Sequence, residues 1–184
     1  MSTTRDWSAF LLPVAALAVA APPTHAMSYL SVAQAQAALF PSAKVFAEAS
    51  LKFDDAQKDR IKAASGLRQR WDAQRVWRAE RDGQLQGWFI VDDVIGKHDF
   101  ITYAVAISPD GRVLGVEVME YRETHGGQIR EATWRRHLVG KNLSDPFKLD
   151  EDVPNITGAT LSCRNVMDGV KRLLAIHKLF LVKA

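Results

Sequence analysis

Residues 84–122 read QLQGWFIVDDVIGKHDFITYAVAISPDGRVLGVEVMEYR, and this stretch decides the fold class. Apolar residues alternate with smaller or polar ones, which suits a sheet with one buried face. Turn signals at Asp82-Gly83 and at residues 109–111 (PDG) separate the extended runs. We therefore expect an antiparallel meander of about four strands, at residues 75–80, 84–94, 99–108 and 112–122.

Helical patterns flank these strands along the chain. Three of these patterns begin at a capping residue, and the pattern at 128–139 contains Trp134 and ends at Gly140-Lys141. The last helix has Ser162 as its expected N-cap, and residues 44–53 look extended or irregular. The expected fold class is α+β, with an antiparallel sheet of about four strands packed by flanking helices. The expected helices span residues 31–40, 54–64, 128–139 and 162–180.

The first 26 residues differ from the rest of the chain. Arg5 precedes an apolar run at residues 10–21, which ends in two prolines and small residues. This run is shorter than the roughly 20 apolar residues that span a bilayer. It predicts a secretory signal peptide at residues 1–26 and export to the periplasm, with an uncleaved membrane anchor as the alternative. An N-terminal helical segment at 27–69 and a main domain at 70–184 complete the predicted organisation.

Charge and cysteine content narrow the classes of function. The formal net charge is +3, and arginines interleave with Trp71 and Trp77 between residues 68 and 81. We expect no nucleic-acid partner for an exported protein, and interpret this stretch as a solvated strand face or a docking surface for an acidic redox partner. Cys163 is the only cysteine, and no Cys-x-x-Cys-His motif or zinc-type cluster occurs. We therefore expect no metal site, and electron transfer would need an organic cofactor.

A hydroxyl-rich turn precedes the last helix. Its sequence is Thr157-Gly158-Ala159-Thr160-Leu161-Ser162. The unpaired amides and the positive end of the helix dipole favour an anion at such a turn, and the anion would be a phosphate. An ordinary Thr-Gly turn before a helix is the alternative.

A second loop with two glycines, at residues 123–127, also leads into an expected helix. The two loops, with Trp134 and Gly140-Lys141 between them, occur in an order that resembles the FMN-binding domain family. This family occurs in the periplasmic flavin subunits of Rnf complexes and sodium-pumping quinone reductases. The resemblance covers roughly residues 87–174, and it makes the main domain at 70–184 an FMN-binding domain.

The resemblance implies a covalent cofactor. In the family, a dedicated flavin transferase uses FAD to esterify FMN, through its phosphate, to the last threonine of a Ser/Thr-Gly-Ala-Thr tetrad. That residue corresponds to Thr160 here. Thr157, Gly158 and Ala159 would leave room for the phosphate, and the amides of Leu161 and Ser162 would accept its charge.

The resemblance also implies residues that line the flavin. They are Glu123, Thr124, Gly126 and Gly127, and the glycine amides would approach the ring oxygens. An ordinary loop is the alternative.

Three further residues have two interpretations each. Trp134 either contacts the ring or belongs to the core, and Lys141 either pairs with phosphate or is a solvated lysine at a helix end. Cys163 either has a pKa lowered by the helix dipole or is a buried structural thiol.

Three positions depart from the family pattern. Pro154 stands where the family has an aspartate, and Asp152 lies two residues before it. Cys163 replaces a serine or threonine, and His125 replaces a proline. The first departure bears on recognition by the transferase, which would depend on Asp152 or be less efficient.

The predicted function is electron transfer by an exported flavoprotein between a membrane-bound reductase and a redox partner. No residue needs to act as an acid–base catalyst. An electron carrier or redox subunit is favoured over a stand-alone enzyme because the sequence contains no recognisable substrate domain. Two alternatives remain. One is a stand-alone periplasmic flavin reductase, and the other is a non-redox module that binds a phosphate-containing ligand.

Overall fold

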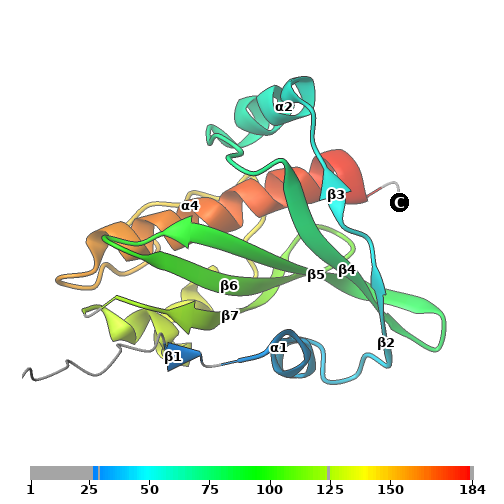
Figure 1. Cartoon of the computed structure of the whole chain (residues 1–184), viewed down its shortest axis with the longest axis horizontal. Helices are drawn as coiled ribbons and strands as arrows, with labels where there is room; N and C mark the ends of the chain where they lie inside the picture. Colours follow the sequence, from blue (N-terminus) through cyan, green and yellow to red (C-terminus); the bar gives the residue numbers. More distant parts are fainter. Residues whose placement is uncertain (1–26, 29, 124, 183–184) are drawn as a thin grey trace, which may run out of the picture.

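Four successive strands form the centre of the sheet, as the turn signals predict (Figure 1). The computed structural model describes residues 27–28, 30–123 and 125–182. Asp82 and Gly83 both have positive φ, 50° and 76°, as a two-residue hairpin turn requires. The predicted meander is confirmed, and its strands are β4 (Ala73–Arg81), β5 (Gln84–Ile95), β6 (Phe100–Ile107) and β7 (Val113–Tyr121).

The sheet contains seven strands, so the expected number of about four is too low. Its order is β1-β7-β6-β5-β4-β2, and β3 pairs with β4 outside this path. The additional strands have two to four residues, too few to show an alternating pattern, and they form by pairing with the edges of β7 and β4. They are β1 (Met27–Ser28), β2 (Val45–Glu48) and β3 (Leu51–Lys52).

Both faces of the sheet are covered, so the expectation of one buried face is wrong. Along β5, Trp88 and Ile90 belong to the core shared with α4 (Thr160–Ile176). Phe89, on the same strand, belongs to a second core beneath α1 (Val32–Leu39). An almost continuous apolar run is what a strand buried on both faces requires.

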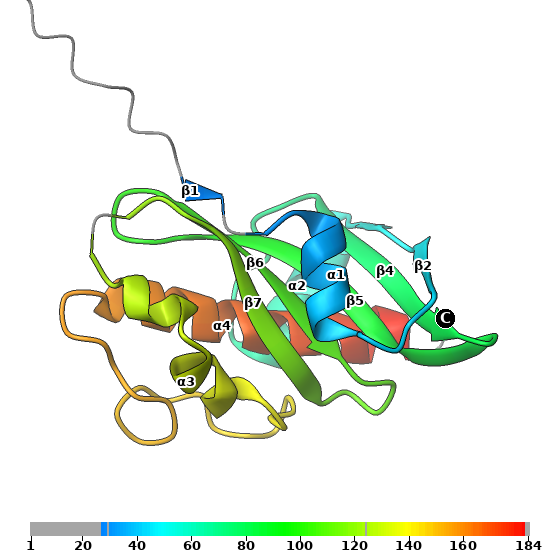
Figure 2. The same ribbon diagram turned by 90° about the horizontal axis from the view of Figure 1, so that it is seen from below.

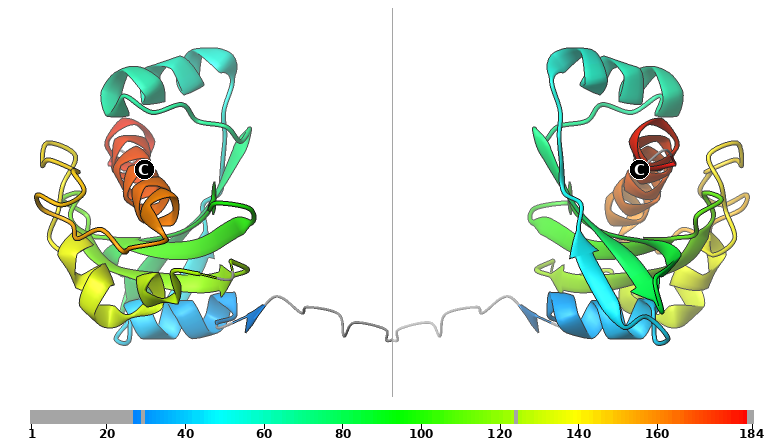
Figure 3. Two further views of the ribbon diagram at one scale, coloured as in Figure 1. Left: turned by 90° about the vertical axis from the view of Figure 1, so that its left-hand side faces the viewer. Right: turned by 90° about the vertical axis from the view of Figure 1, so that its right-hand side faces the viewer.

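The helices form layers on the two sides of the sheet. Figure 2 shows α1 lying across one face, and the end-on views of Figure 3 show α4 on the other face with α2 (Asp55–Ser65) beyond it. The first two helices begin with capping boxes, formed by Ser31 in α1 and Asp54 in α2. The predicted helices at 31–40 and 54–64 are confirmed within one residue or two.

The expected helix at residues 128–139 is interrupted. A 3₁₀ turn at Gly127–Arg130 precedes α3 (Ala132–Arg135), and Glu131 between them has an extended backbone. A second 3₁₀ turn follows at Arg136–Leu138. Ile129 and Trp134, on either side of the break, are both buried.

The N-cap assigned to Ser162 is also wrong. Helix α4 begins at Thr160, and Ala159 occupies the N-cap position with no side-chain hydrogen bond. The turn before the helix closes through the backbone, because the Ala159 amide donates to the Ile156 carbonyl (2.9 Å). The last helix continues past Ile176 as a π-helical turn at His177–Leu181.

The predicted signal peptide at residues 1–26 lies outside the described residues. Within the part of the chain that the structure describes, no helix combines the length and apolar character that crossing a bilayer requires.

Candidate functional site

The two glycine-containing loops meet at the N-terminal end of α4. Gly126 lies directly against Ala159, because a Cβ atom at Gly126 would overlap with the Ala159 methyl group. Gly126 also has φ of 82°, a left-handed conformation that favours glycine. Two segments that are far apart in the sequence therefore form one site.

Tyr121, the last residue of β7, connects the two loops from the sheet. Its hydroxyl donates to the His125 carbonyl in the first loop, and it is hydrogen-bonded with the side chain of Ser162 in α4. Burial raises the pKa of Tyr121, and the bond with Ser162 opposes that rise. Tyr121 belongs to no motif; its only signal in the sequence is an aromatic residue immediately before the glycine loop.

Thr160 is the first residue of α4 and is half-buried. In the described part of the chain its hydroxyl makes no hydrogen bond, and the amides of Thr160, Leu161 and Ser162 have no acceptor. Gly158 has φ of 83°, with no atom within 4 Å of where a Cβ would lie, so this side of the turn is open. An accessible hydroxyl beside three free amides is a donor set that fits a phosphate.

A wide hollow of about 680 Å³ lies over the first loop. The amides of Gly126 and Gly127 donate to no acceptor among the described residues, so they are available beside it. Thr124 lies outside the described residues. The hollow is lined by His125, Gly126, Gly127, Gln128, Arg130 and Glu131.

Trp134 supports the second loop from the core. The indole is 4% exposed, and its Nε1 donates to the Pro154 carbonyl at 2.7 Å. Pro154 is the residue that replaces the family's aspartate, directly before the turn. The core interpretation of Trp134 therefore describes its packing, and contact between this indole and a flavin ring stays a prediction.

Lys141 is not a solvated lysine, and its pairing with a phosphate stays a prediction. Its side chain is 13% exposed, and its ammonium forms an ion pair with Asp152 and donates to the Pro146 carbonyl at 3.1 Å. Burial alone would raise the pKa of Asp152, but the bonds from Lys141 and the Lys148 amide lower it. Asp152 therefore stabilises the loop before the turn.

Glu123 connects the first loop to the turn between β5 and β6. Its carboxylate accepts the amides of His98 (2.6 Å) and Asp99 (3.1 Å), and a Cβ at Gly96 would overlap with it. Burial alone would raise the pKa of Glu123, but these amides and that of Lys97 lower it below its ordinary value. The predicted contact of Glu123 with a flavin is not tested by this geometry.

Cys163 is a buried thiol, fully enclosed in the first turn of α4. Burial raises its pKa, so the expectation of a pKa lowered by the helix dipole is wrong. Among the described residues no group of three or more His, Cys, Asp or Glu side chains could hold a metal ion.

The paired loops lie in a segment that is similar to a flavin-binding domain. Residues 96–175, less than half of the chain, match the model of the FMN-binding domain family. One relative is a subunit of the ion-translocating oxidoreductase complex of Stutzerimonas stutzeri. This subunit is 28% identical to the chain over 110 residues, which make up 54% of the chain. The chain spans about half the length of that relative, 48%.

A solved structure shows the same fold. NqrC of Shewanella oneidensis superimposes with a TM-score of 0.53 at 19% identity, over 74% of this chain and 81% of that one. The predicted α+β class and the resemblance to the FMN-binding domain family are both confirmed.

Proposed function

We propose that this protein carries FMN covalently, as a phosphoester of Thr160, and acts as an electron-transfer protein. The observation that supports this most directly is the contact between Gly126 and Ala159. It brings the two loops that carry the family's motif together around one half-buried hydroxyl. FMN supplies reversible electron uptake and release when it is bound.

The chain's own residues would hold the cofactor at both of its ends. The amides of Thr160, Leu161 and Ser162 would donate to the phosphate, which the positive end of α4 also favours. The amides of Gly126 and Gly127 would donate to the ring. An exposed anion gains only about 0.3–1 kcal/mol from a helix end, too little to retain a cofactor in dilute surroundings, and an ester bond solves this.

Attachment would need a flavin transferase as a partner. The Thr160 oxygen would form a bond to the phosphorus of the FMN half of FAD, AMP would leave, and the hydroxyl proton would pass to solvent. Pro154 offers no carboxylate, and the Asp152 carboxylate is bound to Lys141. We infer that the transferase recognises the shape of the turn, which Trp134 supports through Pro154, and not a free aspartate.

The proposed place of action is the periplasm, with a membrane-bound redox partner. The support for export is the sequence of residues 1–26. The support for the partner is that the Stutzerimonas stutzeri relative is named as a subunit of an ion-translocating oxidoreductase complex. The protein would then carry electrons as one part of a larger membrane-bound assembly.

One experiment tests the cofactor assignment. The full chain is co-expressed with a flavin transferase, and a denaturing gel is viewed under ultraviolet light. We expect a fluorescent band from the wild type and none from Thr160→Ala. Ser42→Ala is the matched control, because it removes an exposed hydroxyl outside the two glycine loops and should leave the band unchanged.

Two outcomes would refute the assignment. A dark wild-type band would exclude a covalent flavin, and a band that persists in Thr160→Ala would exclude this acceptor. Steady-state turnover of a small acceptor by the flavinylated protein alone would support the alternative of a stand-alone reductase.

A further inference from the structure

A second cavity lies away from the two glycine loops, between the segment that follows α2 and the middle of α4. Its volume is about 140 Å³. An engineered cavity of roughly this size holds a benzene molecule, so this one is large enough for a single ring. The apolar part of its lining comes from Leu67, Trp71, Val94 and Ile95.

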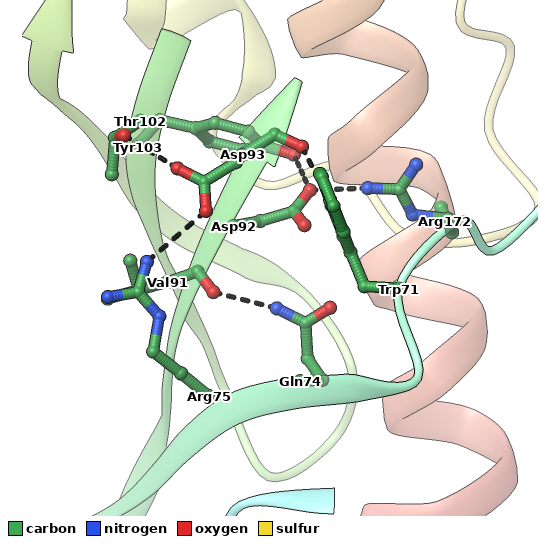
Figure 4. A network of polar contacts seen from close by, with 9 residues as sticks. All are labelled: Trp71, Gln74, Arg75, Val91, Asp92, Asp93, Thr102, Tyr103 and Arg172. Carbon is green, nitrogen blue, oxygen red and sulfur yellow. Dashed lines mark hydrogen bonds and ion pairs between the residues drawn. The ribbon is translucent and has the colours of Figure 1, made fainter. Parts of the chain in front are cut away.

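Arg172 of α4 lines this cavity and is nine-tenths buried. One of its terminal nitrogens, Nη2, bonds to Asp92 at 2.5 Å, and Tyr103 donates to the same Asp92 oxygen at 2.6 Å. Figure 4 shows the Arg172 guanidinium directed at the Asp92 carboxylate, with Trp71 drawn beside them. The Nε of Arg172 is buried and has no acceptor among the described residues. An orphaned donor of this kind is costly unless a ligand or water accepts from it.

The charged lining is predominantly positive. Arg68 and Arg70 line the cavity, are exposed, and form no ion pair or hydrogen bond within the described ranges. The carboxylate of Asp93 is already bound to Arg75 and Thr102. The other acidic side chain in the lining is Asp168, which has no cationic partner within 4 Å in the described part of the chain. The two exposed arginines therefore face one free carboxylate, and Arg172 beside them is already paired with Asp92.

We propose that this cavity binds a ring-sized organic anion, with its carboxylate or phosphate group on Arg172 and the two exposed arginines. The indole of Trp71, 40% exposed, covers the ring. Arginine suits such groups because its planar array of donors matches two oxygen atoms. Asn165 of α4 also lines this cavity, about 7.5 Å along the helix axis from Thr160.

The test uses benzoate as the probe and benzylamine, the same ring with a cation, as its counterpart. Binding to the full chain is measured by calorimetry and by the NMR shift of the Trp71 indole N–H, assigned with Trp71→Phe. We expect saturable benzoate binding at least about tenfold tighter than that of benzylamine. Inorganic phosphate, which lacks a ring, should bind more weakly than benzoate.

A pair of matched double variants locates the site. Arg68→Gln with Arg70→Gln should weaken benzoate binding by about tenfold or more. Arg81→Gln with Arg112→Gln removes the same charge from exposed arginines outside the cavity and should leave the affinity unchanged within about twofold. Equal losses in both double variants, or tighter binding of benzylamine, would overturn the proposal.

The Thr160→Ala protein separates this cavity from the flavin site. It should bind benzoate with the affinity of the wild type co-expressed with the transferase, whether or not the flavin assignment is correct. A clear difference in affinity between these two proteins would show that the cavity belongs to the cofactor site, which would overturn it as a separate site.

Discussion

At the scale of single residues, the geometry of the site depends on two glycines. Gly126 and Gly158 have almost the same backbone conformation, φ 82° and 83°, but only Gly126 is in contact with the opposite loop. This pair separates the effect of backbone conformation from the effect of packing. Any side chain at Gly126 would push the two loops apart.

Gly126→Ala should therefore destabilise the protein more than Gly158→Ala. Both variants place alanine in a left-handed conformation, at about 1–2 kcal/mol. Gly126→Ala adds an overlap with the Ala159 methyl group, for a total of about 2–4 kcal/mol. Urea denaturation measures both, and equal losses of unfolding free energy would contradict the contact between the loops.

At the scale of secondary-structure elements, one carboxylate connects the turn between β5 and β6 to the loop after β7. Glu123 makes this connection by accepting the amides of His98 and Asp99. Because the folded pKa of Glu123 is below its ordinary value of 4.5, the ionised form is favoured by folding. The stabilisation is present above the unfolded pKa and is lost as the pH falls through the folded pKa.

Glu123→Gln should accordingly lower stability most near neutral pH. The difference in unfolding free energy between wild type and variant should shrink as the pH falls below about 4.5, when the wild-type carboxylate becomes protonated. Urea denaturation at about pH 7 and about pH 3.5 measures this. Glu151→Gln is the control, since Glu151 bonds only to the Lys148 side chain among the described residues, and a constant difference for Glu123→Gln would refute the role of the amides.

At the scale of the whole molecule, α4 is attached to the sheet by close packing and by a buried polar network. Gly169 lies against Tyr103, because a Cβ atom there would overlap with the Tyr103 hydroxyl oxygen. That hydroxyl donates to Asp92, which also binds Arg172 of α4. Burial raises the pKa of Asp92, and Arg172 and Tyr103 oppose the rise, so the ion pair depends on both partners.

Gly169→Ala should destabilise the protein by about 2–4 kcal/mol, although alanine is favoured over glycine in a helix by about 1 kcal/mol. Tyr103→Phe removes the oxygen atom with which the new methyl group collides. The two changes together should cost at least about 1 kcal/mol less than the sum of the single changes. Thermal or urea denaturation of the three variants measures this coupling, and additive costs would show that the helix does not approach the sheet here.

The sequence alone determined the central meander, the first two helices and the two loops of the candidate site. These features depend on local signals, such as the Asp82-Gly83 turn and the cap at Asp54, which act over a few residues. The Thr-Gly-Ala-Thr tetrad is equally local, and its resemblance to the FMN-binding domain family placed the candidate acceptor at Thr160.

Only the tertiary structure decided how these parts meet. The contact of Gly126 with Ala159, the Tyr121 connection and the ion pair of Lys141 with Asp152 join residues that no local pattern relates. The short strands have the same origin, because pairing with a long strand outweighs weak local preferences. These features depend on how distant segments pack together. A local sequence pattern shows which side chains are present but not which distant residues they will contact.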